Sequence, residues 1–416
     1  MDITFNGGCA RGAVEVPPSK SYTHRAIIMA ALSGERCRVC NPLVSLDTMA
    51  TADAVRSMGA DVQRMDYGFL IESNGLHAPD RVIDVKNSGT TMRLMTGIAA
   101  LFDSETTITG DESIRKRPMA PLLEALESCG VSCGSNDGKA PISIRGPPTS
   151  GVIRIDGSMS SQFVSSMLMM SPLMGRPVDI IIEGRAVSRP YIDITVSMMR
   201  RFGIDLEEME NGFRIESQCY RPCNFKVPSD FSSAAFPLVA GGLSGSVTVK
   251  GLDMSDPQGD KRIVDILRDV GCRIDITEDG ITCSNDGRPK AKDIDISDVP
   301  DLFPIVAVLM STADGTSRLY GAPQLRFKES DRIASVERML SELGADIEGT
   351  DDGCIINGVP RLKGGRIDHL GDHRLMMSAA IASLISDGPV SMVDDSCWNV
   401  SYPGFVDQMR SIGLRC

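Results

Sequence analysis

The sequence contains no apolar run long enough to cross a membrane and no excess of basic residues. Hydrophobic residues make up 42% of the 416 residues, yet no apolar segment reaches the roughly 20 residues that a membrane-spanning helix needs. The N-terminal residues Met1-Asp2-Ile3-Thr4 lack the basic and apolar segments of a secretory signal, so we expect a cytoplasmic protein. The formal net charge of -12 argues against a general nucleic-acid-binding protein, which would need a basic face.

The motifs of several common enzyme classes are missing as well. We find no Walker A motif and no GxGxxG that opens a helix after a strand, so nucleotide binding has little support. The glycine-rich segment Gly241–Gly245 is interpreted as a loop and is weak evidence for a nucleotide site. The chain has only 4 histidines, of which His373 alone lies in a suggestive segment, so a Ser-His-Asp triad could be assembled only arbitrarily.

The 12 cysteines do not follow a metal-binding or disulfide pattern. Cys37-Arg38-Val39-Cys40 is the only CxxC, and Val39 favours a strand there. Residues i and i+3 of a strand face opposite sides, which is poor geometry for one metal ion. The two CxxxC pairs, Cys129/Cys133 and Cys219/Cys223, have no matching histidines. We therefore expect reduced thiols that act as small apolar side chains, and no metal site.

A pattern of about 70 residues recurs six times along the chain. Each copy has a helix with one apolar face, then a glycine that favours positive φ, a short strand, a turn and a second strand. The turns include Asn211-Gly212, Asp279-Gly280 and Asp352-Gly353, which are favoured in type I′ hairpins. The helix-ending glycines are Gly59, Gly130, Gly203, Gly271, Gly344 and Gly413.

Each repeat also contains a second helix, which begins with small polar residues and continues into Ala, Met, Leu and Ile. Helices rich in small apolar residues can be buried on nearly every side, and Ser, Thr and Asp favour N-cap positions. The expected helix starts are Ser19-Lys20-Ser21, Asn87-Ser88-Gly89-Thr90, Ser158-Met159-Ser160-Ser161, Ser229-Asp230-Phe231-Ser232, Ser297-Asp298 and Gly371-Asp372-His373.

The sixth repeat ends at Cys416 without room for its hairpin. The N-terminus supplies a candidate hairpin in Ile3–Phe5 and Ala13–Val16, separated by Gly7-Gly8. We therefore expect the chain to begin and end in one domain. Lobe I would comprise residues 1–18 and 229–416, and lobe II would comprise residues 19–228, with three repeats in each. This closure argues against an open solenoid.

Basic residues lie at or beside several of the expected helix starts. Lys20 and Arg25 flank the first start, Arg93 follows the second, and Arg374 follows Asp372-His373. Helix N-termini carry free N–H groups and a partial positive charge, so they bind anions. Each basic residue alone could be a solvated surface charge, but their repetition indicates a cationic site for phosphorylated small molecules. An acidic protein that carries such a cluster would concentrate anions there.

The chain resembles the 5-enolpyruvylshikimate-3-phosphate synthase family of enolpyruvyl transferases essentially from end to end. The matching segments are Pro18-Ser19-Lys20-Ser21, Asn87-Ser88-Gly89-Thr90-Thr91-Met92-Arg93, Arg117-Pro118, Ser160-Ser161-Gln162, Ser188-Arg189-Pro190-Tyr191-Ile192-Asp193, Pro300-Asp301, Lys328-Glu329-Ser330-Asp331-Arg332 and Asp372-His373-Arg374. The resemblance implies an α/β (α+β) fold of two lobes, each with three βαβαββ units in an inverse α/β barrel, and an active site in the cleft between the lobes.

The resemblance also implies the reaction, which belongs to the shikimate pathway towards chorismate and aromatic amino acids. The 5-hydroxyl of shikimate 3-phosphate attacks C2 of phosphoenolpyruvate while C3 gains a proton, and the tetrahedral intermediate then eliminates phosphate. The family requires no metal or organic cofactor, and its inhibitor glyphosate would compete with phosphoenolpyruvate. We expect small-molecule substrates, no nucleic-acid or membrane partner, and a monomer.

By resemblance, each substrate is held by a defined set of residues. The residues expected to bind phosphoenolpyruvate are Lys20, Gly89, Thr90, Arg117, Gln162, Arg332 and Arg374. The residues expected to bind shikimate 3-phosphate are Lys20, Ser21, Arg25, Ser160, Ser161, Gln162, Ser188, Tyr191, Asp301, Gln324 and Lys328. Both substrates are multiply anionic, so bringing them together needs compensating cations.

Proton transfer needs a base for the hydroxyl and an acid for the methylene carbon. Asp301 is the candidate base, and Glu329 and Lys20 are candidates for the proton transfers at the enolpyruvyl group. Each carboxylate also has a structural interpretation. Asp301 would stabilise the first turn of a helix, and Glu329 would form an ion pair with Lys328 or Arg332.

Three positions depart from the family pattern. Val400 aligns where many relatives carry a lysine that contacts phosphoenolpyruvate, so one cation is missing. Gln324 stands where asparagine is frequent and has the same hydrogen-bonding groups. Leu94 stands where some relatives have proline, which should slightly alter the helix that carries Gly89.

Three alternatives remain at this point. UDP-N-acetylglucosamine enolpyruvyl transferase shares the fold and the donor, but it often has a reactive cysteine before its Arg-Pro. The segment Gly110–Arg117 has none, and Ser160-Ser161-Gln162 favours the shikimate substrate. RNA 3′-terminal phosphate cyclase shares the repeat unit but would need nucleotide chemistry. A non-catalytic anion-binding repeat protein would bind the same ligands without turnover.

Overall fold

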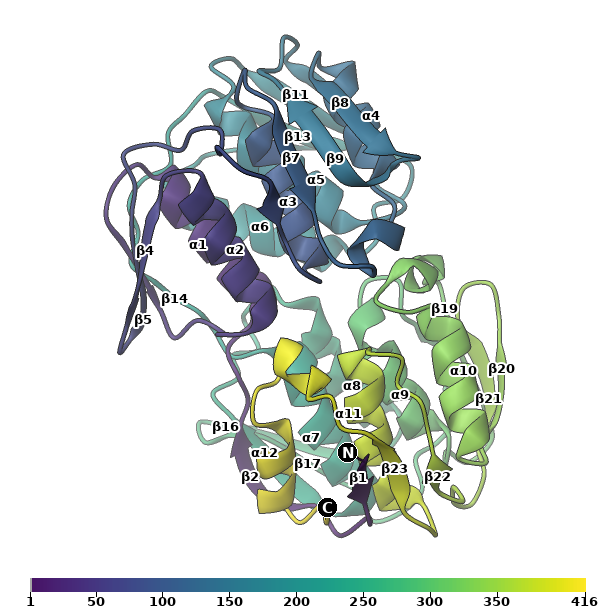
Figure 1. The fold of residues 1–416 in the computed structure, drawn as a ribbon. Helices are drawn as coiled ribbons and strands as arrows, with labels where there is room; N and C mark the ends of the chain where they lie inside the picture. The colour runs from purple at the N-terminus through teal and green to yellow at the C-terminus, as the bar shows by residue number, and fades with distance from the viewer. Residues whose placement is uncertain (1) are drawn as a thin grey trace. The chain divides into compact units, whose positions relative to one another are not determined.

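The computed structural model describes residues 2–416, and the chain divides into two compact units. Lobe I comprises the residues up to Pro17 together with Pro228–Cys416, and lobe II comprises Pro18–Val227. Each lobe contains three small sheets and six α-helices among the described residues (Figure 1). No helix in residues 2–416 is long and apolar enough to cross a membrane.

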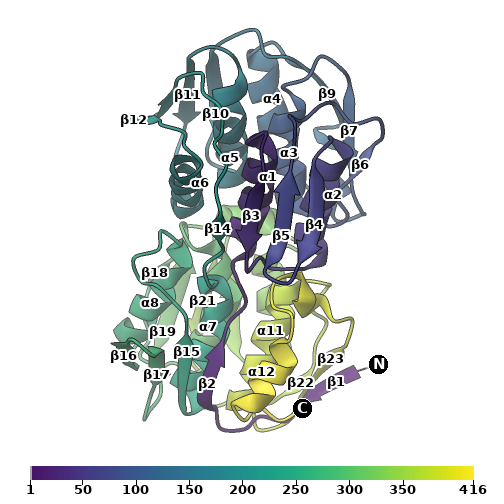
Figure 2. The same ribbon diagram turned by 90° about the vertical axis from the view of Figure 1, so that its left-hand side faces the viewer.

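Lobe II contains three four-stranded sheets. Their strand orders are β14-β3-β5-β4, β6-β7-β9-β8 and β10-β11-β13-β12, and in each sheet the first two strands are parallel while the others are antiparallel. Figure 2 shows β14, β3, β5 and β4 side by side. The strands are β3 Cys37–Cys40, β4 Asp61–Met65, β5 Gly68–Glu72, β6 Ile83–Asp84, β7 Thr106–Thr109, β8 Ser132–Asn136, β9 Lys139–Arg145, β10 Val152–Asp156, β11 Val178–Glu183, β12 Glu207–Met209, β13 Gly212–Ile215 and β14 Phe225–Lys226.

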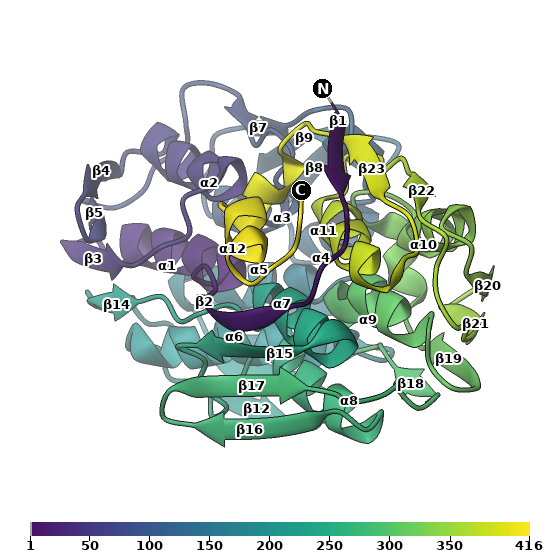
Figure 3. The same cartoon turned by 90° about the horizontal axis from the view of Figure 1, so that it is seen from below.

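Lobe I contains two four-stranded sheets and one three-stranded sheet. Their orders are β16-β17-β15-β2, β18-β19-β21-β20 and β1-β23-β22, and Figure 3 shows β2, β15, β17 and β16 in sequence. The strands are β1 Asp2–Phe5, β2 Arg11–Glu15, β15 Ser246–Lys250, β16 Arg273–Thr277, β17 Gly280–Ser284, β18 Ile294–Asp295, β19 Thr316–Tyr320, β20 Asp346–Gly349, β21 Cys354–Asn357, β22 Gly365–Arg366 and β23 Val390–Val393.

The helices alternate between an inner and an outer member along the chain. In lobe II they are α1 Lys20–Leu32, α2 Leu46–Ser57, α3 Gly89–Ala99, α4 Ala120–Ser128, α5 Ser161–Met170 and α6 Arg189–Arg201. In lobe I they are α7 Phe231–Ser244, α8 Ile263–Asp269, α9 Phe303–Met310, α10 Arg332–Glu342, α11 His373–Ala382 and α12 Phe405–Ser411. Inner helices such as α1 and α11 are buried on nearly every side. Strands such as β10 alternate between buried and exposed residues, because one face of the sheet covers the inner helices and the other faces solvent.

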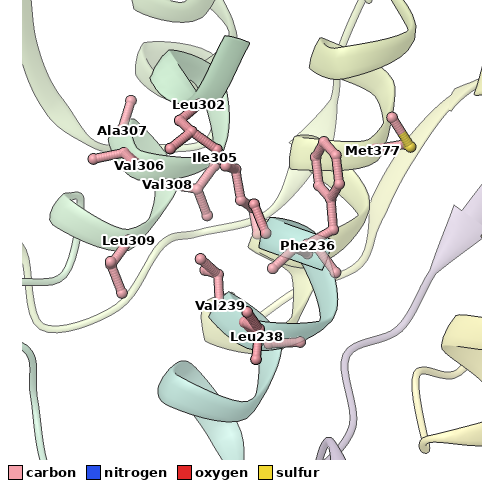
Figure 4. Packing of buried hydrophobic residues seen from close by; sticks show 14 of the residues in the cluster. Phe236, Leu238, Val239, Leu302, Ile305, Val306, Ala307, Val308, Leu309 and Met377 are labelled. Carbon is pink, nitrogen blue, oxygen red and sulfur yellow. The ribbon is translucent and has the colours of Figure 1, made fainter. Parts of the chain in front are cut away.

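The three inner helices of lobe I, α7, α9 and α11, pack against one another. Figure 4 shows this core, where Phe236 and Val239 of α7 meet Ile305 and Val308 of α9 beside Met377 of α11. All five side chains are buried to at least 99%. Removing a buried phenylalanine side chain from such a core typically costs about 3–5 kcal/mol. This packing positions the residues at the helix starts, including those that the sequence assigns to substrate binding.

Most of the predicted elements form, and the helix-ending glycines Gly59 and Gly344 have φ of 99° and 88°. The expected N-terminal hairpin is wrong, because β1 pairs with β23 and β2 pairs with β15 in another sheet. The fold therefore distributes the N-terminal strands between the sixth and the fourth repeat. Each N-terminal strand thus joins a sheet of three or four strands. Such a sheet is more stable than an isolated two-stranded hairpin.

Three local expectations also need correction. Gly241–Ser244 is not a loop but the end of α7, since small residues let the helix pack closely against β17 and Cys283. None of the three turns expected to be type I′ has that geometry, which needs positive φ at both central residues. Gly212 and Gly280 have positive φ but the preceding Asn211 and Asp279 do not, and neither residue of Asp352-Gly353 does. The helix expected at Ser297-Asp298 begins later, as the 3-10 helix η4 Pro300–Leu302 that leads into α9.

Candidate active site

Asp301 of lobe I is surrounded by three basic side chains. It lies in η4, directly before α9. Its Oδ1 accepts a hydrogen bond from Arg332 Nη1 at 2.9 Å and lies 3.5 Å from Lys328 Nζ. Its Oδ2 accepts from Arg374 Nη2 at 3.0 Å. The structure thus brings together four residues that the sequence assigns to the active site.

Arg332 links this cluster to two further carboxylates. It is the first residue of α10, its side chain is 1% exposed, and its Nη2 donates to Glu329 Oε2 at 2.7 Å. Its Nε donates to Oδ2 of the fully buried Asp372 at 2.8 Å. Asp372 also caps α11, because its Oδ1 accepts from the Arg374 backbone N–H at 2.9 Å. Asp372 therefore holds the Arg332 side chain and caps the helix that carries Arg374.

The electrostatics of the cluster favour ionised groups. Burial alone would raise the pKa of Asp301, but Arg374, Lys328 and Arg332 hold it well below the usual range. Burial likewise opposes ionisation of Asp372, and Arg332 lowers the pKa of Asp372. The pKa of Arg332 is raised, since Asp372, Glu329 and Asp301 outweigh the burial of its charge. The arginines thus carry full charge, and Asp301 is a carboxylate.

Gln324 and Val400 complete the predicted positions in lobe I. Gln324 lies in the 3-10 helix η5 Pro323–Phe327 and is 5% exposed, and its Nε2 donates to the Ser297 carbonyl at 3.2 Å. Within residues 2–416 its Oε1 is buried and accepts no hydrogen bond, so it has capacity for a ligand hydroxyl. Val400 ends the 3-10 helix η7 Cys397–Val400 and supplies no charge where many relatives have a lysine.

Lys20 is the first residue of α1 in lobe II. Its Nζ lies 2.9 Å from Oδ2 of Asp47, the second residue of α2. Both side chains are largely buried, and Asp47 Oδ1 has no hydrogen-bond partner among the described residues. Asp47 therefore holds Lys20 in place while retaining a free acceptor. The expected N-cap Ser19 makes no side-chain capping hydrogen bond, unlike Ser88 at the start of α3.

The start of α3 brings Gly89 and Thr90 close to Gln162 and two arginines. Gln162 donates from Nε2 to Thr90 Oγ1 at 3.0 Å and accepts from Arg93 Nη1 at 2.6 Å. A Cβ atom on Gly89 would lie 2.6 Å from Nη1 of Arg117, which is closer than real contacts allow. Arg117 follows the 3-10 helix η1 Ile114–Lys116 and donates to Ser113 Oγ at 3.1 Å. Gly89 is thus the residue that lets Arg117 approach the helix start.

Arg25 lies deep within lobe II and is 1% exposed. It donates from Nε to Thr195 Oγ1 at 2.7 Å, from Nη1 to the Ser21 carbonyl at 2.9 Å, and from Nη2 to Ser165 Oγ at 3.2 Å and the Tyr191 carbonyl at 3.3 Å. Burial lowers the pKa of Arg25 to about 10, so it remains charged at neutral pH. Arg25 therefore links α1, α5 and α6 through hydrogen bonds. Its direct contact with the substrate stays a prediction.

The predicted serines lie at the starts of α5 and α6. Ser160 caps α5 by accepting from the Gln162 backbone N–H at 3.3 Å, and Ser161 is the buried first residue of that helix. Ser188 precedes α6 in a left-handed conformation with φ 54°, which is uncommon for a residue other than glycine. Such strain often marks functional positions. The Ser188 carbonyl accepts a hydrogen bond from the Tyr191 backbone N–H at 3.0 Å.

The sequence analysis missed three carboxylates that the structure places beside the predicted residues. Asp47 lies in the first turn of α2 after the N-cap Ser45, where acidic residues are common, so the sequence does not indicate its contact with Lys20. Asp372 belongs to the quoted Asp372-His373-Arg374 segment, which could have indicated its role. Asp260, in the 3-10 helix η3 Gly259–Arg262, carries no signal of its own in the sequence.

Two features of the structure could indicate a metal site: the cysteines, and a group of three side chains with possible metal-ligand atoms. All 12 cysteines are free, and Cys37 and Cys40 lie in β3 as expected. Among residues 2–416, His369, Asp395 and Cys397 place donor atoms close together. However, His369 Nδ1 accepts from the Gly371 N–H at 3.1 Å, so Nε2 carries the proton and donates to the Val393 carbonyl at 3.0 Å. Both ring nitrogens are engaged, and we assign no metal to this cluster.

The chain is similar to known proteins over nearly its whole length. The family profile described as EPSP synthase (3-phosphoshikimate 1-carboxyvinyltransferase) matches residues 6–409. Proteins named 3-phosphoshikimate 1-carboxyvinyltransferase are 45% identical in Methanocorpusculum labreanum, covering 99% of both chains, and 39% identical in Methanocaldococcus jannaschii, covering 97% and 96%. An EPSP synthase structure from Acinetobacter baumannii has a TM-score of 0.81 at 28% identity and covers 99% of this chain and 98% of that chain.

Proposed function

This chain belongs to the EPSP synthase family, and from this premise we propose how its residues divide the binding and the proton transfers of the reaction. It acts as an enolpyruvyl transferase of the shikimate pathway, with the two-lobe mixed α/β fold of that family. The enolpyruvyl group of phosphoenolpyruvate moves to the 5-hydroxyl of shikimate 3-phosphate, and phosphate leaves. The family assignment sets aside the UDP-N-acetylglucosamine transferase, the RNA cyclase and the non-catalytic repeat protein.

Phosphoenolpyruvate binding is assigned to cations from both lobes. Lys20 and Arg117 of lobe II and Arg332 and Arg374 of lobe I supply charge, and Gly89, Thr90 and Gln162 supply the helix start and its polar side chains. The support is chemical, since arginine matches carboxylate and phosphate oxygens in pairs and a helix start adds N–H donors. Each cation is held by a carboxylate or hydroxyl, which keeps it oriented before the ligand arrives.

Shikimate 3-phosphate is assigned to the serines and to the amide groups. Ser21, Ser160, Ser161 and Ser188 would bind its phosphate at helix starts, with Arg25, Lys328 and Gln162 adding charge and hydrogen bonds. Tyr191 would line the ring, and Asp301 and the free Oε1 of Gln324 would receive the ring hydroxyls. The hydroxyl groups add donors to the backbone N–H groups at these helix starts.

The proton transfers are assigned to Asp301, Glu329 and Lys20. Asp301 accepts the proton of the 5-hydroxyl as it attacks C2, and Glu329 or Lys20 delivers the proton that C3 gains. The low pKa of Asp301 makes it a weak base in the free protein. Anionic substrate at Arg374 and Arg332 would weaken their hold on Asp301, which would raise its pKa when it must act.

The observation that carries this assignment is the position of Asp301 between Lys328, Arg332 and Arg374. The test is phosphate release from phosphoenolpyruvate in the presence and absence of shikimate 3-phosphate. We expect release only with both substrates. Equal release without shikimate 3-phosphate, or none with it, contradicts the proposed function.

We further propose that residues of both lobes act on the same pair of substrates, in a cytoplasmic monomer. This follows from the charge requirement, since neither lobe alone supplies all four predicted phosphoenolpyruvate cations. Small-angle scattering should then show a smaller radius of gyration with both substrates bound, because closure excludes water from the reaction. Light scattering measures the mass in the same samples, and an unchanged radius of gyration contradicts the closure.

A further inference from the structure

Asp260 is a buried carboxyl group of lobe I that the proposed mechanism does not use. It lies in η3, which packs against α7, and is only 2% exposed. The Ser232 hydroxyl, in the first turn of α7, donates a hydrogen bond to its Oδ2. Its Oδ1 is also buried and has no hydrogen-bond partner among residues 2–416. A buried carboxylate oxygen without a donor is costly, so this geometry favours the neutral carboxylic acid.

The charged groups around Asp260 come from all the elements that meet at the starts of the inner helices. Asp230, the N-cap of α7, and Asp301 of η4 oppose ionisation, whereas Arg374 of α11 favours it. On η3 itself, Lys261 donates to the carbonyls of Met254 and Asp256, and Arg262 is the remaining cation. Burial is the largest influence on Asp260 and Asp301 the next, and they raise its pKa to about 7 against the opposing effects of Arg374 and the Ser232 hydrogen bond.

The neighbouring cluster is balanced in formal charge. Lys328, Arg332 and Arg374 face the carboxylates of Asp301, Glu329 and Asp372. A charged Asp260 would add a fourth negative group close to Arg374, where an anionic substrate is expected. A neutral Asp260 adds none. The charge state of Asp260 therefore changes the electrostatic attraction of this cluster for the substrate anion.

We propose that Asp260 is a positioning residue that acts through Arg374 and sets the affinity for phosphoenolpyruvate. In its neutral form it adds no negative charge near Arg374, and in its charged form its negative charge opposes the binding of the substrate anion there. This inference rests on the proposed function, which assigns Arg374 to phosphoenolpyruvate.

The test compares pH profiles of kcat/KM for phosphoenolpyruvate in the wild type and in Asp260→Asn. Asparagine keeps the size of the side chain and an acceptor for Ser232 but has no charge. With a pKa of about 7, the neutral fraction of Asp260 falls from about nine-tenths at pH 6 to about one-tenth at pH 8. We expect the ratio of variant to wild-type kcat/KM to rise by up to about tenfold over this interval. Ionisation of the substrates cancels in the ratio.

A second variant should shift the pH at which kcat/KM falls, whereas Asp260→Asn should remove this fall. The Ser232 hydrogen bond lowers the pKa of Asp260, so Ser232→Ala should raise that pKa and shift the loss of kcat/KM to higher pH. The matched control is Asp265→Asn on α8, an exposed carboxylate paired with Arg268, which should keep the wild-type profile. A merely structural role of Asp260 would lower activity equally at every pH.

A wild-type pH profile in Asp260→Asn overturns the proposal. If Asp260→Asn does not fold, as judged by circular dichroism, Ser232→Ala decides, and an unshifted profile overturns the proposal. Failure of the proposed function is distinguishable, since the wild type would then release no phosphate at any pH.

Discussion

Arg374 donates two hydrogen bonds to Asp301, one to carboxylate Oδ2 at 3.0 Å and one to the backbone carbonyl at 3.3 Å. The predicted base and a predicted substrate cation are therefore partners before any substrate binds. The arrangement keeps Asp301 ionised and oriented, because Arg374 lowers its pKa.

Asp301→Asn should lower kcat by about 10²–10⁴-fold, because the neutral amide cannot accept the hydroxyl proton. The KM for phosphoenolpyruvate should change much less, since the cations remain. Steady-state phosphate release measures both constants, and circular dichroism checks the fold. Asp298→Asn, three residues earlier in the chain and before the start of η4, is the matched control with expected wild-type turnover. A loss confined to KM would assign Asp301 to binding alone.

Asp372→Asn should reduce the free energy of unfolding by about 3–5 kcal/mol at neutral pH, because it removes the fully buried carboxylate that faces Nε of the buried Arg332. The folded-state pKa of Asp372 is lowered, so its contribution is present above the unfolded pKa of about 4 and is lost as the pH falls through the folded value. The difference between variant and wild type should thus shrink in acid.

Urea unfolding at pH 7 and at successively lower pH measures this difference. Asp387→Asn removes the exposed partner of Arg361 and should cost less than about 1 kcal/mol at every pH. A pH-independent loss in Asp372→Asn would show that the charge of Asp372 is not the source of the stabilisation, since asparagine also caps helices.

Gly89→Ala should raise the KM for phosphoenolpyruvate by about tenfold or more, because the new methyl group displaces the Arg117 guanidinium that lies 2.6 Å from its position. Competitive inhibition by glyphosate should weaken as well. Gly287→Ala is the control, since nothing lies within 4 Å of the place that its new methyl group would occupy. Unchanged inhibition in Gly89→Ala would place the inhibitor away from the start of α3.

Lys20→Met should lower activity by at least about 100-fold, as should Arg117→Ala, because both remove preorganised charge. Lys20→Met also leaves Asp47 buried without its cation, so it should cost about 1–3 kcal/mol of stability. Adding Asp47→Asn should restore the stability but not the activity, as thermal unfolding and phosphate release would show. Recovery of both would make Lys20 a structural residue.

Much of this protein could be predicted from the sequence because its signals are local and repeated. The apolar face of each outer helix and the glycine that ends it follow from residues a few positions apart, and six copies make the pattern unmistakable. The cations at helix starts, such as Lys20 and Arg374, were visible for the same reason. The N-terminal hairpin failed because β1 and β2 find their partners hundreds of residues away, in β23 and β15.

The order of amino acids is enough to establish which residues carry charge and which helix starts present them. The pairing of those charges depends on how the chain folds. Asp47 and Asp372 look like ordinary helix-start carboxylates until folding brings Lys20 and Arg332 to them. The pKa of Asp260 is raised because folding buries its side chain and brings the charge of Asp301 near it. Ionisation depends on burial and on distances between segments far apart in the chain, and packing alone sets both.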